Sequence, residues 1–284
     1  MSKYKNIFFA LMTSCISVSL HALELKPPSD YTKIKDGNGV DLYTDTSNGV
    51  YVEVIDLKGG GEISFNGFYT EAKDGKYPRY TIYSLNDYYN KRINGHFSLI
   101  NGQFFDNGSS TTGLAFPVKT NGIIKSASIW DQKIKKRTFI VNNGTNGYAY
   151  IIDGYNVNNL NEKTYKEVIV SLHPDENKSS SSSIGRNFVG VYDPNCKNYY
   201  CTSRYVLFFI AKNKTTADIK NIALKWGVSD SGLAMMDGSG SSQIIAGDYS
   251  LYGSSYPTIY YPDKRAIPHV ILTSGSHNLL AINN

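Results

Sequence analysis

The feature of this sequence that most constrains its fold is the regular return of short runs rich in β-branched and aromatic residues, separated by clusters of Gly, Asn and Asp. Residues of the first kind favour strands, and those of the second kind favour tight turns. The runs predict strands within residues 49–57, 61–69, 79–85, 97–105, 137–143, 148–155, 167–172, 186–193, 204–211 and 269–275. A sheet-dominated core follows from this pattern.

Helices are few in the same pattern. The segment 215–227, "TTADIKNIALKWG", has apolar residues at helical spacing, with Thr215 or Thr216 available as a cap and Gly227 as a stop. The segment 85–92, "LNDYYNKR", is a shorter candidate. With no internal repeat or long linker, the sequence predicts an α+β fold: a single domain with a large mixed or antiparallel sheet core and a few packed helices.

The N-terminus, "MSKYKNIFFALMTSCISVSLHA", has two lysines, an apolar run and then the small residue Ala22, which is the layout of a secretory signal peptide. The apolar run is too short for a transmembrane helix, and no later segment is long and apolar enough to span a membrane. A lipoprotein signal cut at Cys15 is the alternative. We expect a signal peptide over residues 1–22 and an exported domain over 23–284, in the periplasm or secreted.

Two cysteines remain after such a cut. Cys196 and Cys201 frame the short segment "CKNYYC". In an oxidising compartment, two nearby cysteines predict one local disulfide. A metal site is the weaker interpretation, because no second pair of ligands with suitable spacing is near.

The charge balance is mild. The formal net charge of the chain is +5, and loss of Lys3 and Lys5 with the signal peptide lowers it to about +3. This gives no electrostatic case for nucleic acid as a partner, which would require a concentrated basic face. The 23 tyrosines fit either strands, which favour aromatic residues, or a surface that stacks on sugar rings, and the count alone does not separate the two.

The familiar hydrolase motifs are absent. The mature sequence contains no G-x-S-x-G, no S-x-x-K and no H-E-x-x-H. Its four histidines, His96, His173, His269 and His277, are scattered, so we expect them to be structural and predict no histidine-based metal site.

Three other segments combine strands with polar residues. In "LINGQFFDNG", 99–108, a strand-like run meets the turn signal Asn101-Gly102 and then Asp106; the segment is either a simple hairpin or a bend with polar groups on both sides. In "SSIGRNFVGVYD", 182–193, Arg186 stands where a strand begins. It is either a solvated surface charge or a fixed fork for a phosphate or carboxylate.

The third segment is "LAMMDGSGSSQ", 233–243, in which an apolar run delivers Asp237 into a loop of Gly and Ser. Glycine lets the backbone approach a ligand closely, and successive backbone N–H groups can bind an anion. The alternative is a flexible turn between strands at 233–236 and 243–247. A calcium loop would require further acidic ligands, which the segment lacks.

In this order, the three segments resemble motifs of the phosphodiester glycosidase family. That family has an "NGGFFD"-like segment, a "GR-T/A-x-x-G" segment, a helix leading to "LNLDGGGSS/T", and a late "R-x-x-x-N/H" segment. This chain has "INGQFFD", "IGRNFVGV", the helix candidate followed by "MMDGSGSSQ", and "RAIPHVI" at 265–271. The likeness runs from about residue 49 to 275. Gln103 and Ser239 replace glycines of the pattern and are expected to add side chains to the pocket, and Met236 replaces an asparagine-like residue.

The resemblance implies an enzyme that needs no cofactor and hydrolyses a carbohydrate substrate, a sugar-1-phosphodiester, at its glycosidic bond. It implies that Asp237 supplies the catalytic carboxylate, with Asp106 as a second candidate, and leaves metal dependence open. The implied substrate-binding residues are Arg186 and Arg265 for the phosphate, and Asn101, Gly102, Gly238, Ser239, Gly240, Ser241 and Ser242 for the sugar and the loop around it.

Two other functions remain open at this point. The same pocket could bind a glycan or phosphoglycan without cleaving it, as the altered "NGQ" and "DGSG" positions suggest. Alternatively, the chain is an exported structural or interaction protein with a serine-rich loop at 177–183, in which case no pocket unites the motifs.

Overall fold

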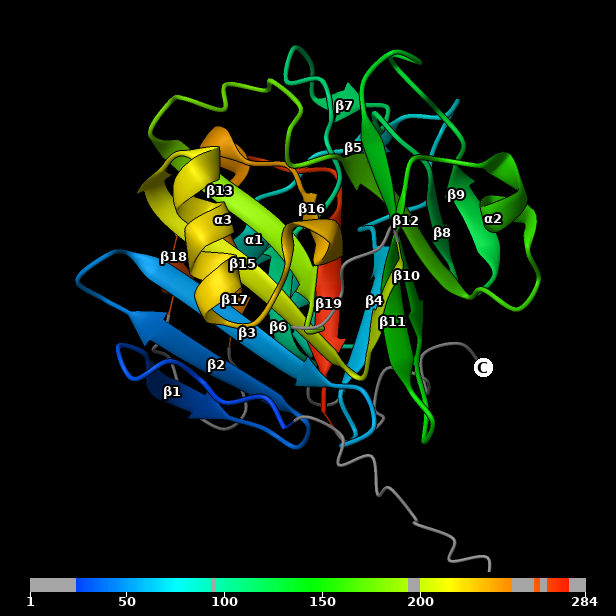
Figure 1. Cartoon of the computed structure of the whole chain (residues 1–284). Coiled ribbons are helices and arrows are strands. Elements are labelled where there is room, and N and C mark those ends of the chain that lie inside the picture. Colours follow the sequence, from blue (N-terminus) through cyan, green and yellow to red (C-terminus); the bar gives the residue numbers. More distant parts are fainter. Residues whose placement is uncertain (1–23, 93–95, 194–199, 247–257, 261–264, 276–284) are drawn as a thin grey trace, which may run out of the picture.

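The computed structural model describes residues 24–92, 96–193, 200–246, 258–260 and 265–275 (Figure 1). The signal peptide expected at 1–22 and Cys196 lie outside these residues. Two antiparallel sheets pack face to face, and every strand pairing within the described ranges is antiparallel. No helix in the same ranges is long and apolar enough to cross a membrane.

The larger sheet has strands from both halves of the chain. Its order is β1 (Thr32–Asp36), β2 (Val40–Asp45), β3 (Val50–Asp56), β15 (Tyr205–Lys214), β13 (Ile184–Val191), β16 (Leu233–Met235), β12 (Glu167–Leu172), β10 (Lys136–Asn142), β11 (Tyr148–Asp153) and β14 (Tyr200–Ser203). The hairpin of β8 (Val118–Thr120) and β9 (Ile123–Ser126) extends it from β12.

The smaller sheet has the order β18 (Thr258–Tyr260), β17 (Ile244–Ala246), β6 (His96–Asn101), β19 (Val270–Ser274) and β4 (Glu62–Gly67). A short ribbon of β5 (Tyr77–Pro78) and β7 (Thr111–Thr112) lies apart from both sheets. Among the described residues, three segments form α-helices: α1 (Ile82–Asn90), α2 (Val157–Asn161) and α3 (Thr216–Lys225).

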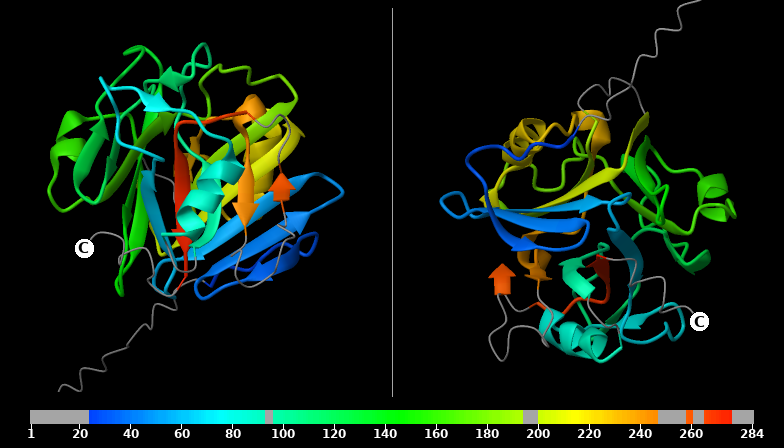
Figure 2. Two further views of the ribbon diagram at one scale, coloured as in Figure 1. Left: turned by 180° about the vertical axis from the view of Figure 1, so that it is seen from behind. Right: turned by 90° about the horizontal axis from the view of Figure 1, so that it is seen from below.

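Alternation along the strands builds a layered arrangement. In β6, Ile100 faces the core between the sheets, and its neighbour Leu99 faces α1 on the outer side. In β15, Phe208 faces the same inter-sheet core, and Phe209 joins the outer cluster that includes Trp226 at the end of α3. The layers are therefore α3, the larger sheet, the smaller sheet and α1: α3 lies in front in Figure 1, and α1 lies in front in the view from behind (Figure 2, left).

The prediction of a largely β protein with a few helices is confirmed, with two packed antiparallel sheets in place of one sheet. The helix predicted at 215–227 is also confirmed: Thr215 and Asp218 form a capping box, and Gly227 follows the helix with φ +77°. The strand predicted at 79–85 is wrong. The Thr81 hydroxyl accepts a hydrogen bond from the backbone N–H of Ser84 (3.2 Å) and caps α1 there.

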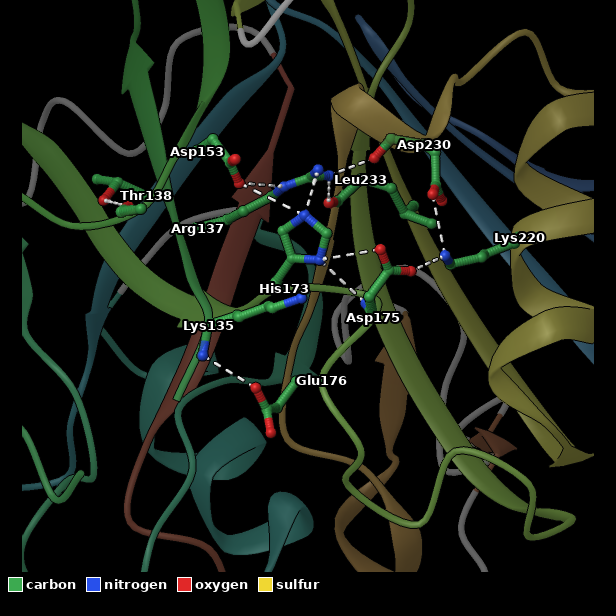
Figure 3. A network of polar contacts seen from close by, with 11 residues as sticks. Lys135, Arg137, Thr138, Asp153, His173, Asp175, Glu176, Lys220, Asp230 and Leu233 are labelled. Carbon is green, nitrogen blue, oxygen red and sulfur yellow. Dashed lines mark hydrogen bonds and ion pairs between the residues drawn. The ribbon is translucent and has the colours of Figure 1, made fainter. Parts of the chain in front are cut away.

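A charged network ties the larger sheet to α3 (Figure 3). The guanidinium of Arg137 pairs with Asp153 (3.3 Å), contacts the ring of His173 (2.8 Å) and donates to the carbonyl of Leu233 (2.5 Å). Lys220 of α3 extends the network through ion pairs with Asp175 and with Asp230. These charged groups contact one another and main-chain carbonyls, so the network fastens α3 to the larger sheet.

Candidate active site

The loop that follows β16 crosses from one sheet to the other. β16 belongs to the larger sheet and β17 to the smaller one, so residues 236–243 connect the two layers. The backbone N–H of Met236 donates to the carbonyl of Asn187 in β13 (2.8 Å), and the carbonyl of Gln243 accepts from Asn101 at the end of β6 (3.0 Å). The crossing therefore holds Asp237 beside Asn101, although 136 positions separate the two residues.

The carboxyl group of Asp237 has several polar neighbours. Asn101 Nδ2 donates to the Asp237 carbonyl (2.9 Å) and to Asp237 Oδ2 (3.2 Å). The Ser241 hydroxyl also hydrogen-bonds the carboxylate, and Arg265 Nη1 donates to Ser241 Oγ (3.4 Å). Burial raises the pKa of Asp237 to about 6, and Asn101, Ser241 and Arg265 oppose that rise. A carboxyl group that titrates near neutrality can serve as a base, a nucleophile or an electrostatic stabiliser.

His269 braces the turn behind Asn101. Its Nε2 donates to the carbonyl of Phe65 (2.9 Å), and its Nδ1 accepts from the backbone N–H of Gln103 (3.1 Å), which assigns the proton to Nε2. Burial lowers the pKa of His269 to about 4, so the ring is neutral at physiological pH. This is the structural role expected for a lone histidine, and His269 is also the final residue of the "R-x-x-x-N/H" segment in the sequence.

Gly102 touches that histidine so closely that no larger residue fits. A Cβ atom at position 102 would lie 2.1 Å from His269 Nδ1. Gly102→Ala must therefore displace the turn that holds Asn101, and we expect it to lower the free energy of unfolding by about 1–3 kcal/mol and to reduce ligand binding. Urea melts of the variant measure the loss. Gly113→Ala is the matched control, because its Cβ would find nothing nearer than 3.7 Å; equal melts for both variants would contradict the prediction.

Buried polar atoms gather around the crossing loop. Within the described ranges, four of them here have no hydrogen-bond partner: Asn101 Oδ1, Asn187 Oδ1, Ser242 Oγ and Gln243 Oε1. A buried polar atom without a partner costs free energy, so a group of them at one place indicates a position for water or for ligand hydroxyls. Of these four residues, Asn187 lines the cavity next to Asp237, and the other three lie behind its wall.

A cavity of about 210 Å³ opens next to Asp237. Its lining includes the charged residues Lys178, Arg186 and Asp237, together with Gly238 and Ser239 of the crossing loop. The rest of the wall consists of the polar residues Ser179 and Asn187 and of apolar residues: Phe104, Ile184, Phe188, Met235 and Met236. The cavity therefore combines one carboxylate with two cationic residues and an apolar surface.

The structure places Arg186 in this wall with its donors already engaged. Nε donates to the carbonyl of Lys214 (2.9 Å), Nη1 to that of Lys178 (3.3 Å), and Nη2 to those of Ser182 (2.8 Å) and Ser179. Four of the five N–H donors of the guanidinium thus bind main-chain carbonyls. Neither interpretation from the sequence matches this geometry. Arg186 is buried, so it is not a solvated surface charge, and its guanidinium binds the serine-rich loop, so it is not an open fork for a phosphate.

Of the other predicted site residues, those of the crossing loop, 236–243, either line the cavity or are buried behind it, and Arg265 lies next to the loop. Ser239 lines the cavity in a left-handed conformation (φ +59°), which is a position that favours glycine. Gly185 packs directly against this turn, and a side chain does not fit at its position, because a Cβ there would lie 2.3 Å from the Ser239 carbonyl oxygen. Gly240, Ser241 and Ser242 are buried behind the loop surface, and Arg265 reaches Asp237 through Ser241.

Asp106 and Gln103 lie away from the cavity lining. Asp106 is exposed, and its carboxylate accepts from the backbone N–H of Gly108 (3.0 Å), which braces its own turn. Gln103 is buried: Nε2 donates to the carbonyl of Val170 (2.7 Å) and Oε1 accepts from the N–H of Phe104 (2.9 Å). The expectation that Gln103 adds a side chain to the pocket is therefore wrong, because that side chain bridges to β12.

Cys201 is buried and disulfide-bonded, while Cys196 lies outside the residues that the structure describes, so the identity of its partner stays a prediction. Among the described residues, no group of three or more His, Cys, Asp or Glu side chains is arranged to hold a metal ion.

The fold resembles that of known proteins, although the sequence does not. No protein-family model matches the chain, and no curated protein matches it by sequence. The zebrafish N-acetylglucosamine-1-phosphodiester alpha-N-acetylglucosaminidase catalytic domain, auto-inhibited by its pro-peptide, has a similar structure with a TM-score of 0.51 at 13% identity, covering 86% of this chain and 81% of that one. A protein of Burkholderia pseudomallei described as a "Putative exported protein" aligns with a TM-score of 0.42 at 9% identity, covering 83% and 74%. The first comparison establishes a distant relationship of fold.

Proposed function

We propose that this protein is an exported hydrolase that cleaves the glycosidic bond of a sugar-1-phosphodiester and releases a sugar and a phosphomonoester. The observation that carries the proposal is Asp237, a carboxyl group with a raised pKa that stands beside Asn101 and Ser241 at the edge of a cavity with cationic residues in its wall. The zebrafish glycosidase domain supports it at the level of fold.

The proposed hydrolysis requires a carboxylate and cationic groups, and the cavity lining contains both. A phosphate monoester is a good leaving group, because it departs as an anion whose second pKa is about 6. Little general-acid help is required, in contrast to ordinary glycoside hydrolysis with its pair of carboxyl groups. One ionised carboxylate near the developing positive charge of the sugar, and cations near the departing phosphate, are sufficient. Asp237 is the carboxylate, and Asp106 is not part of the lining.

The test is an activity screen on sugar-1-phosphodiesters that measures the released phosphomonoester, with nitrophenyl glycosides of the same sugars as a comparison. We expect turnover of the phosphodiesters in preference to the nitrophenyl glycosides. Since Asp237 must be ionised, kcat/KM should rise with pH through about 6, where its carboxyl group titrates. Absence of turnover across sugars that bind the protein would overturn the proposal.

A second candidate is a binding protein that holds a glycan or phosphoglycan without cleaving it. The amide oxygen of Asn187 favours this function, because it lies in a residue of the cavity lining, has no partner among the described residues, and suits a sugar hydroxyl in a ground-state complex. Tight binding of an intact phosphodiester, with no product after long incubation, would select it.

Export is part of the proposal. It depends on the signal-peptide layout of residues 1–22 and on the local pair Cys196 and Cys201, which suits an oxidising compartment. Mass spectrometry of the mature protein would show cleavage near Ala22 and a Cys196–Cys201 disulfide.

A further inference from the structure

The cavity has two cationic residues in its wall, and they differ in what their charged groups contact. Arg186 is buried, and its guanidinium is engaged with main-chain carbonyls. Lys178 is exposed, and its ammonium has no hydrogen-bond or ion-pair partner among the described residues. Lys178 is therefore the cation in this lining that remains able to bind a ligand directly.

The two residues are also connected. Arg186 Nη1 donates to the carbonyl of Lys178 itself (3.3 Å), and Nη2 donates to the carbonyls of Ser179 and Ser182. The side chain of Arg186 thus fixes the main chain of the loop that carries Lys178. Without it, a segment of consecutive serines has few packing contacts to hold it in place.

We propose that Lys178 binds the phosphate group of the ligand at the cavity, and that Arg186 is a positioning residue that holds the loop of Lys178. The inference rests on the proposed function for the nature of the ligand, a glycosyl phosphodiester, and adds the residue that binds its phosphate. An ammonium is a compact charge with three donors, which suits phosphate oxygens. Lys178 and Asp237 come from different segments of the lining. In the proposal, the ammonium of Lys178 binds the phosphate and the carboxylate of Asp237 acts on the sugar.

The direct test is a calorimetric titration with inorganic phosphate and with glucose 1-phosphate. Lys178→Met removes the ammonium and keeps the apolar stem, and we expect binding of both ligands to weaken about tenfold, the effect of one charge-assisted hydrogen bond. The melting temperature should not change. Lys163→Met is the matched control, because Lys163 is also exposed and does not line the cavity. Equal affinities for the Lys178→Met and Lys163→Met proteins would overturn the proposal.

A double-mutant cycle tests the positioning role. Arg186→Lys keeps the positive charge but cannot bind four carbonyls with a planar fork, so it should weaken phosphate binding and lower the melting temperature. In the Lys178→Met background, the same change should not weaken binding further, because Arg186 acts through Lys178. Additive losses of affinity would show that Arg186 contacts the anion itself and would refute this role.

The inference and the proposed function can fail separately. Phosphate binding that depends on Lys178, in a protein that hydrolyses no phosphodiester, would retain the site and reject the hydrolase. Hydrolysis with an unchanged KM in Lys178→Met would retain the hydrolase and reject the site. A wild-type protein that binds neither phosphate nor glucose 1-phosphate would also reject the site.

Discussion

Asp237→Asn is expected to lower kcat by on the order of 10³-fold or more, the loss seen when a key preorganised electrostatic group is removed. The change keeps the shape of the side chain and removes the charge that would stabilise the anomeric carbon. Substrate affinity should persist, because the cations of the cavity wall are unaltered. The protein should still fold but with a lower melting temperature, because the carboxylate accepts from Asn101, Ser241 and the backbone N–H of Gly238, and the new amide N–H₂ would face at least one of these donors.

Steady-state kinetics and a melting curve on the same variant decide this prediction. Asp131→Asn is a suitable control, because Asp131 is an exposed turn aspartate that accepts from the N–H of Lys133 (2.8 Å). Asp106→Asn should behave like the control, since Asp106 is outside the cavity lining. A folded Asp237→Asn protein with near-normal turnover would remove Asp237 from the catalytic mechanism.

The second large effect concerns Glu53, a fully buried carboxyl group in the core between the sheets. Its Oε2 accepts from Ser98 Oγ (2.6 Å), and its Oε1 has no partner in the part of the chain that the structure describes. Burial raises the pKa of Glu53 to about 7. Because the pKa is higher in the folded state than in the unfolded state, the protonated group stabilises the fold at low pH, and this contribution is lost as the pH rises through 7.

Glu53→Gln should remove this dependence. We expect the variant to be more stable than the wild type above pH 8, by up to about 3 kcal/mol, and similar to it near pH 4.5. Denaturant melts of both proteins from pH 4.5 to 9 measure the effect as the difference between their stabilities. The lowered pKa of His269 acts in the opposite direction at low pH, but it cancels in this difference because both proteins carry His269. Parallel stability curves for the two proteins across this range would contradict the prediction.

Glu167 is the matched comparison, because it is also buried with a pKa raised to about 7. Its carboxylate accepts from Phe65 N (2.7 Å), Asn121 N (2.8 Å) and Thr120 Oγ1 (2.9 Å), so both oxygens have donors. In Glu167→Gln, the new amide N–H₂ would face at least one of these donors. This variant should therefore be destabilised throughout the pH range, in contrast to Glu53→Gln.

Local signals in the sequence predicted local structure well. The helix at 215–227 carries its own cap, spacing and stop, and the structure has α3 there. The helix start at Ile82 was missed, because aromatic and β-branched residues surround the single capping residue Thr81. Which sheet a strand joins is not a local property. β16 and β17 lie close in the sequence and belong to different sheets, so a pattern of runs could only predict a turn between them.

The same limit applies to the site. The sequence placed Asn101 and Asp237 in related motifs, and the structure brings them within hydrogen-bond distance. The hydrogen bonds from Arg186 to main-chain carbonyls could not be predicted. Every residue has a main-chain carbonyl, so the sequence does not indicate which ones a side chain will bind. A binding role for Lys178 could not be predicted either, because an exposed lysine in a serine-rich loop has no distinguishing sequence pattern.

The crossing of residues 236–243 between the sheets makes the site dependent on how the two layers are held together. Asn101 ends a strand of the smaller sheet, Asn187 belongs to the larger sheet, and Asp237 lies on the chain that joins them. Neither sheet alone carries the full set of groups. Any loosening of the inter-sheet core, even far from the cavity, would separate the Asn101 amide from the Asp237 carboxylate before the strands unfold. Loss of ligand binding would therefore be the first sign that the two sheets have begun to separate.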